Sequence, residues 1–235
     1  MKKIALIMLL LAGIIQNAAA EKLPDGTVVD NSNIENAQKK YLEYTFKKPV
    51  NLKTPLGILP AIYAAFNYDG SVRNIWFAEK QMIESPVGRL YAKRVGFTML
   101  DSKNYVGEIY LGDSFRIKIP AGDLVLGEYD ILKFDCYGYM YWITIEHTRT
   151  RELHTKYGIL KVEGGIKIDP GEESILDVKL SEPAEIATTA GRLTFAGNLY
   201  FKVKGDIHSG SLLKPQKIST TAGKAVINRI TFNSD

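Results

Sequence analysis

The stretch Lys53-Thr-Pro-Leu-Gly-Ile-Leu59 sets the pattern on which the rest of the chain is built. A glycine stands in the same local setting five more times, as in Glu84-Ser-Pro-Val-Gly-Arg-Leu90. Recurrence at a fixed period of this length is typical of repeat architectures. The six glycines are spaced 31, 34, 36, 33 and 32 residues apart: Gly57, Gly88, Gly122, Gly158, Gly191 and Gly223.

Apolar residues keep a fixed distance from these glycines. Two residues after the glycine stands a leucine in five copies, for example Leu59, and an alanine, Ala225, in the sixth. Because solvent-facing positions have no reason to stay apolar in every copy, such columns predict equivalent buried positions. The column five residues before the glycine is aliphatic throughout: Leu52, Ile83, Ile117, Leu153, Ile186 and Ile218.

Each copy has the composition of short strands joined by turns. In Thr54-Pro-Leu-Gly57 the proline occupies the second turn position, where its fixed φ favours a type I turn. An extended run follows, and Asp69-Gly70 then indicates a hairpin into a third run. Lys167 interrupts an apolar column, which predicts a slip of register there. After residue 49 we find no stretch with the period of a long helix.

The sequence therefore predicts an all-β fold: a tandem repeat of about six ~33-residue three-stranded units in a single domain over residues 41–235. A meander sheet, a β-roll and a solenoid-like array all fit this organisation. A six-bladed propeller fits less well, because blades usually have ~40–50 residues. An outer-membrane β-barrel needs strands of about 9–11 residues, whereas most runs here span five to seven residues and are interrupted by Lys, Glu and Arg.

The first twenty residues have the organisation of an export signal. Lys2 and Lys3 precede the uncharged apolar run Ile4–Ile15, and the small residues Ala18-Ala19-Ala20 follow. This run is too short to span a bilayer, which takes about 20 apolar residues. We expect cleavage after Ala20, a periplasmic or secreted location, and no transmembrane helix in the mature chain.

Residues 21–40 form a polar arm outside the repeat. Ser32-Asn33-Ile34-Glu35 has the spacing of a capping box, which predicts a short helix over residues 33–39. A solvated arm without a helix is the alternative.

Composition and charge exclude several classes of protein. The chain of 235 residues carries 30 Lys+Arg against 26 Asp+Glu, a net charge of +4. Removing Lys2 and Lys3 leaves 28 against 26, so the clustered basic face of a nucleic-acid-binding protein has no support. A single cysteine, Cys136, excludes an internal disulfide and leaves either a buried thiol or a link between chains.

The sequence contains no recognisable motif of a cofactor, metal or catalytic site. The three histidines, His147, His154 and His208, lack the spacing of zinc ligands. Nothing near Cys136 supplies the activated thiol and third orienting group that a cysteine nucleophile needs. We therefore expect no cofactor, no metal and a non-enzymatic protein, with a secreted enzyme of scattered catalytic residues as the alternative.

The richest aromatic stretch runs from Phe134 to Trp142. The two-residue period of a strand predicts that Tyr137, Tyr139 and Tyr141 share one face. The tyrosines either pack across neighbouring strands or, if exposed, offer contacts to a protein or a sugar. With the basic residues that follow, they make up the candidate binding residues: Tyr137, Tyr139, Tyr141, His147, Arg149 and Arg151.

The export signal, the repeat and the missing catalytic motif together favour an exported binding protein. Repeat arrays commonly bind through their extended surfaces. We expect the partner to be a protein or glycan of the cell envelope or exterior, and not a nucleic acid.

The export signal leads to a first prediction, about the N-terminus and location of the mature protein. Processing at Ala20 gives a mature protein that begins at Glu21 and fractionates with the periplasm or the medium. N-terminal sequencing and intact mass of the protein from an expressing bacterium measure this. Retention of Met1 in the membrane fraction would contradict it.

Overall fold

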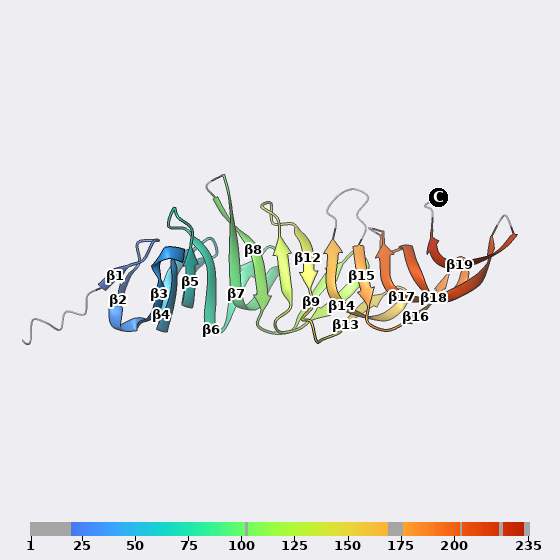
Figure 1. Cartoon of the computed structure of the whole chain (residues 1–235), viewed down its shortest axis with the longest axis horizontal. Coiled ribbons are helices and arrows are strands. Elements are labelled where there is room, and N and C mark those ends of the chain that lie inside the picture. Colours follow the sequence, from blue (N-terminus) through green and yellow to red (C-terminus); the bar gives the residue numbers. More distant parts are fainter. Residues whose placement is uncertain (1–19, 102, 169–175, 203, 221–222, 233–235) are drawn as a thin grey trace, which may run out of the picture. The chain divides into compact units, whose positions relative to one another are not determined.

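A computed structural model describes residues 20–101, 103–168, 176–202, 204–220 and 223–232 (Figure 1). Strands make up 73% of the described residues and helices 3%, which confirms the all-β prediction. The chain falls into two compact units, residues 1–78 and 79–235, and the boundary lies inside one long strand. Residues 1–19 of the proposed export signal (residues 1–20) lie outside the described residues.

The first unit is an antiparallel meander preceded by a small hairpin. The hairpin pairs β1 (Ala20–Lys22) with β2 (Val28–Asp30). The meander pairs each strand with the next along the chain. Its strands are β3 (Ile34–Gln38), β4 (Glu43–Thr54), β5 (Gly57–Phe66) and the first half of β6 (Val72–Ser85).

The prediction of a short helix over residues 33–39 is wrong. A 3-10 turn, η1 (Asn31–Asn33), leads directly into strand β3, and a second one, η2 (Lys39–Tyr41), follows it. Asn33 accounts for the difference, because its amide bonds the backbone N–H and C=O of Lys48. These two bonds and the pairing of Ile34 with Phe46 hold the arm against β4 as an extended strand.

The second unit continues the antiparallel pattern. The strand pairs that the structure describes are antiparallel, and the sheet is open rather than closed. After the second half of β6, its strands are β7 (Gly88–Leu100), β8 (Lys103–Leu111), β9 (Phe115–Ile119), β10 (Gly122–Leu126), β11 (Ile131–Phe134), β12 (Met140–Thr144), β13 (Arg151–Thr155), β14 (Gly158–Ile168), β15 (Leu176–Leu180), β16 (Ala184–Thr188), β17 (Gly191–Phe201), β18 (Ile207–Thr220) and β19 (Gly223–Thr231).

The same tight turn closes four hairpins. In the first, the Thr54 hydroxyl donates to the Gly57 carbonyl at 2.8 Å and accepts from the Leu56 N–H at 3.1 Å. Gly57 has a φ of +98°, a backbone angle that residues with a side chain rarely adopt, so the turn requires glycine at this position. The corresponding hydroxyl–glycine pairs are Ser85 with Gly88, Thr155 with Gly158, and Thr188 with Gly191.

The strands that follow these turns are longer than the five to seven residues we expected, because each continues through a bend. In β14, Leu160 and Val162 are buried before the bend and Ile166 is buried after it. Gly164, with a φ of +72°, lies between them, and the pairing with β15 shifts register from Glu163 onward. The pairing register thus shifts just before Lys167, where the sequence predicts a slip, and a shift of the same size accompanies the bend of β17.

The bend changes the partner of each half of the strand. The first half of β14 pairs with β13, and its second half pairs with β12. Strand β17 behaves in the same way, since it pairs first with β16 and then with β15. β14 and β17 thus each belong to two neighbouring stretches of sheet, and both halves of each strand contribute buried apolar side chains.

Five of the six aliphatic residues that precede the turn glycines are buried. The column is 0–7% exposed at Leu52, Ile83, Ile117, Leu153 and Ile186. Ile218, the sixth member, is only half-buried. The apolar column therefore lies in the hydrophobic core at its first five positions and is only partly covered at Ile218.

This difference makes a prediction about stability. Leu153→Ala leaves a cavity in a fully covered core and should lower the free energy of unfolding by about 2–5 kcal/mol. Ile218→Ala removes a side chain that is already partly in water and should cost less than about 1.5 kcal/mol. Urea unfolding of the two variants measures both values, and equal losses would contradict the burial assignment.

Candidate functional site

The three candidate tyrosines do not share a strand face. Tyr137 and Tyr139 lie in the loop that joins β11 to β12, and only Tyr141 lies in a strand. The sequence prediction of a tyrosine ladder is therefore wrong, because the strand pattern ends at Phe134 and a turn intervenes. The loop takes precedence over the two-residue period since Asp135 and Gly138 both favour a turn.

One carboxylate holds this loop in shape. The Asp135 side chain accepts the backbone N–H of Tyr137 and of Tyr139, each at 2.9 Å. The Asp135 backbone N–H also donates to the Tyr139 carbonyl at 2.9 Å, and the Gly138 N–H donates to the Asp135 carbonyl at 3.1 Å. Gly138 has a φ of +84° and lies beside Pro86 of the β6–β7 turn. The loop is therefore a pre-organised tip.

The aromatic rings on this tip point into solvent. Tyr137 is 81% exposed, Tyr139 63% and Tyr141 40%. Cys136, which lies between Asp135 and Tyr137, is half-buried and is a free thiol. Exposure of this degree separates the tyrosines from the core, so substitution there is expected to affect contacts more than folding. The tip is therefore available as a binding surface.

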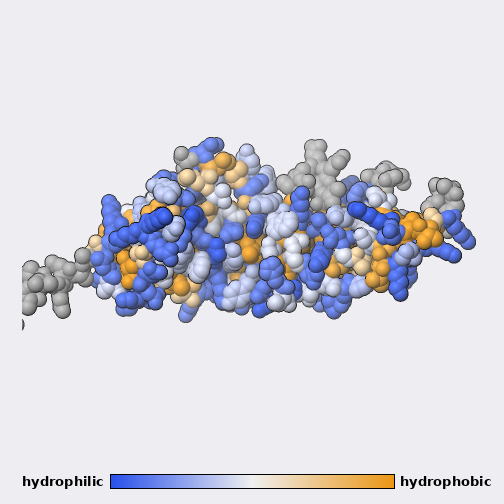
Figure 2. All heavy atoms as spheres, in the orientation of Figure 1, coloured by the Kyte–Doolittle hydropathy of each residue, from blue (hydrophilic) through white to orange (hydrophobic). Residues whose placement is uncertain are grey.

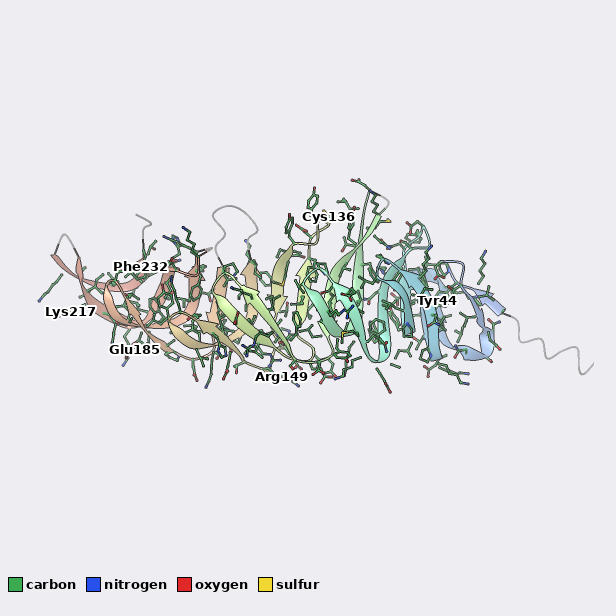
Figure 3. All side chains as sticks on the ribbon, turned by 180° about the vertical axis from the view of Figure 1, so that it is seen from behind. Tyr44, Cys136, Arg149, Glu185, Lys217 and Phe232 are labelled. Carbon is green, nitrogen blue, oxygen red and sulfur yellow. The ribbon has the colours of Figure 1, made fainter. Side chains whose placement is uncertain are left out.

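The basic candidates lie at the other end of β12. His147 is exposed in the turn after the strand, and the Arg149 guanidinium pairs with the Glu146 carboxylate at 2.8 Å. Figure 3 labels Cys136 and Arg149, which lie at opposite margins of the second unit. The structure thus divides the predicted site in two and does not bring Arg149 to the tyrosines.

Arg151, the last candidate, forms an ion pair with the buried carboxylate of Asp130. Its guanidinium donates to both oxygens of Asp130, from Nε at 2.6 Å and from Nη2 at 3.1 Å. Asp130 is fully buried and also accepts the backbone N–H groups of Gly127 at 2.8 Å and Glu146 at 3.0 Å. Four hydrogen bonds saturate this carboxylate, so the pair is structural and offers no free charge to a ligand.

The pair fixes an interruption between β10 and β11. Gly127 packs so closely on Arg151 that a Cβ there would lie 2.6 Å from Nη2. Tyr129, two residues on, has a φ of +70°, which is uncommon for a tyrosine. Sequence reasoning missed this arrangement. The available signal was the extra length of the third copy, 36 residues between glycines.

A lysine–tyrosine network surrounds the same interruption on the surface. Lys93 Nζ donates to the Tyr129 hydroxyl at 2.9 Å, lies 4.6 Å from that ring's centroid and pairs with Glu128. The hydrogen bond from Lys93 lowers the pKa of Glu128, and the same bond raises the pKa of Lys93. Lys80 makes a similar contact with the Tyr91 ring while pairing with Asp113. These charges satisfy one another.

Comparison with known proteins does not identify a family or a function for the chain. Comparison with family models, with curated proteins and with solved structures finds no match. Among the described residues no group of His, Cys, Asp or Glu is placed to hold a metal ion. The described part of the chain also has no helix long and apolar enough to cross a membrane.

The buried pair gives a second stability prediction. Asp130→Ala strands the Arg151 guanidinium without its partner and should cost about 3–5 kcal/mol. The matched control Arg149→Gln breaks a half-exposed pair and should cost about 0–1 kcal/mol. Thermal and urea unfolding compare the two, and a small loss for Asp130→Ala would show that the pair is not structural.

Proposed function

We propose that the chain is an exported, non-enzymatic binding protein built as an array of six β-repeat units of three strands each. The recurring hydroxyl–glycine turn and the buried aliphatic column support the repeat. The export signal in residues 1–20 supports location in the periplasm or outside the cell. In such an array each unit covers its neighbour, so the outermost units have an uncovered side.

We infer that a partner binds the last unit, because one edge of β19 is available for strand pairing. Inner long strands are paired on both edges, since the second half of β17 lies between β15 and β18, and that of β14 lies between β12 and β15. Within the described residues, β19 pairs with β18 alone. Its other edge therefore presents backbone N–H and C=O groups in the geometry that accepts a further strand.

Apolar side chains beside this edge are also incompletely covered. Ile218 and Ile227 are half-buried, whereas their counterparts in inner units, such as Leu153 and Val162, are fully buried. Val226 is 62% exposed on the opposite side of the strand. Figure 2 shows hydrophobic surface over β18 and β19. An added strand would complete both the backbone pairing and the burial.

These features define the partner by its chemistry. It is a protein that contributes an extended segment with apolar residues at every second position, because alternate side chains of an added strand face the core. Backbone hydrogen bonds supply affinity without sequence preference, and the half-buried isoleucines supply the preference for apolar residues. A glycan satisfies neither requirement, so a protein partner is favoured.

Photo-crosslinking in the exporting cell tests the proposal. A photoreactive amino acid at Val226 should yield a discrete adduct whose cross-linked peptide is an extended segment of the partner. The same amino acid at Ile159, which is 59% exposed on β14, is the matched control and should yield none. An inward-facing charge on an edge strand opposes strand addition, so Ile227→Lys should reduce the adduct by about tenfold. Equal adducts at both positions, or no adduct at Val226, would overturn the proposal.

A further inference from the structure

Two hairpin tips of the second unit lie at the same end of neighbouring strands. Strands β8 and β11 pair with Lys133 opposite Glu108. From this pair, β8 runs back five positions to Lys103 at the tip of the β7–β8 hairpin, where Leu100 pairs with Lys103. In the same direction, β11 runs four positions to Tyr137. The two tips therefore end at similar heights, side by side.

Large apolar and aromatic side chains project from both tips. Met99 is 45% exposed and Leu100 44%, beside the Tyr137 and Tyr139 rings of the β11–β12 loop. Figure 2 shows hydrophobic residues at the margin where the β7–β8 hairpin ends. Isolated exposed hydrophobic residues are common, but these four lie on two neighbouring hairpin tips, and apolar surface gathered in this way marks an interaction site.

The patch is poor in charge. From Phe134 to Ile145 the sequence has one ionisable acid or base other than tyrosine and cysteine, Asp135, and that carboxylate is turned inward to two backbone N–H groups. The neighbouring tip carries Asp101 and Lys103, which offset each other. A partner that recognises charge has little to bind here.

Most backbone N–H groups of the tyrosine loop are hydrogen-bonded within the protein. The N–H groups of Asp135, Tyr137, Gly138 and Tyr139 all have protein acceptors. A buried N–H without an acceptor costs free energy, and it is this cost that keeps irregular loops out of lipid. In the β11–β12 loop this cost is reduced, because the Asp135 carboxylate accepts the N–H groups of Tyr137 and Tyr139.

We propose that these two tips dock the protein on a phospholipid bilayer, with the Met99 and Leu100 side chains entering the boundary of the acyl chains and the tyrosines lying among the headgroups. Tyrosine favours this level of a membrane, because its ring is apolar and its hydroxyl hydrogen-bonds to water and headgroups. Lys103 can reach headgroup phosphates along its flexible stem. The Asp101 carboxylate limits insertion to a shallow depth.

Lipid fits the patch better than a protein pocket does. Most N–H groups of the β11–β12 loop already have acceptors, so this loop offers few donors to a protein partner. A protein hot spot typically combines aromatic anchors with arginine or other polar contacts. The arginines predicted for this role lie elsewhere, one of them held by Asp130. This surface is separate from the β19 edge, so the two proposals stand or fall independently.

Vesicle flotation tests the docking. The exported protein is mixed with phosphatidylcholine vesicles, with or without phosphatidylglycerol, and the floating fraction gives a partition coefficient. Tyr137→Ser with Tyr139→Ser should lower this coefficient by about tenfold in both lipids, since the aromatic rings and not charge drive the contact. Ile159→Ser, at an exposed site of β14, is the matched control and should leave the coefficient unchanged.

An environment-sensitive thiol probe locates the contact. With Cys136→Ser removing the native thiol, a probe on Tyr137→Cys should shift its emission to shorter wavelength when vesicles are added, and a probe on Ile159→Cys should not. Circular dichroism confirms that the variants fold. No flotation of the wild type, flotation that the double variant retains, or a probe at residue 137 that stays in water would each overturn the proposal; a protein captured only through the tyrosines would identify the competing partner class.

Discussion

The structure depends on a constraint seen in the long strands β14 and β17: their core-facing apolar side chains must stay buried while each strand changes partners at a bend. Strict alternation cannot satisfy this requirement, because the bend alters which side chains face the core. The chain solves the problem with an irregular residue at the bend. Gly164 in β14 and Gly197 in β17 have φ values of +72° and +74°, and the register shifts across each of them.

The third long strand meets the same constraint differently, and the buried ion pair follows from that. Here the strand breaks into β10 and β11, and four residues from Gly127 to Asp130 replace the bulge. A break exposes backbone groups that a bulge would leave paired, so they need another acceptor. The Asp130 carboxylate accepts the N–H of Gly127, at the start of the break, and that of Glu146, beyond the end of β12, and is in turn neutralised by Arg151. Burying a charge costs free energy. Here the buried Asp130 carboxylate bonds backbone N–H groups beside the strand ends.

Sequence reasoning reached the fold class because its signals are local. The turn glycines and the aliphatic column report on a hairpin closed within a few residues, and the Thr54–Gly57 hydrogen bond shows why both recur. The sequence does not reveal which candidate residues lie together where the deciding contacts are distant in sequence. Nothing near Arg151 announces that it reaches Asp130, 21 residues earlier. The tyrosine prediction was wrong for a local reason: the strand period placed three tyrosines on one face, whereas the Asp135 carboxylate holds two of them in a loop.

The succession of strand pairs has a consequence for how the molecule forms. Most pairs join strands that are next to each other, or next but one, along the chain, as in β13 with β14 and β15 with β17. A strand therefore finds its partners soon after it leaves the ribosome or a translocation pore, without waiting for the other terminus. Such sequence-local closure keeps loop entropy low and favours rapid folding for an all-β chain. The protein can accordingly assemble progressively from its first hairpin, with little time for unpaired edges to aggregate.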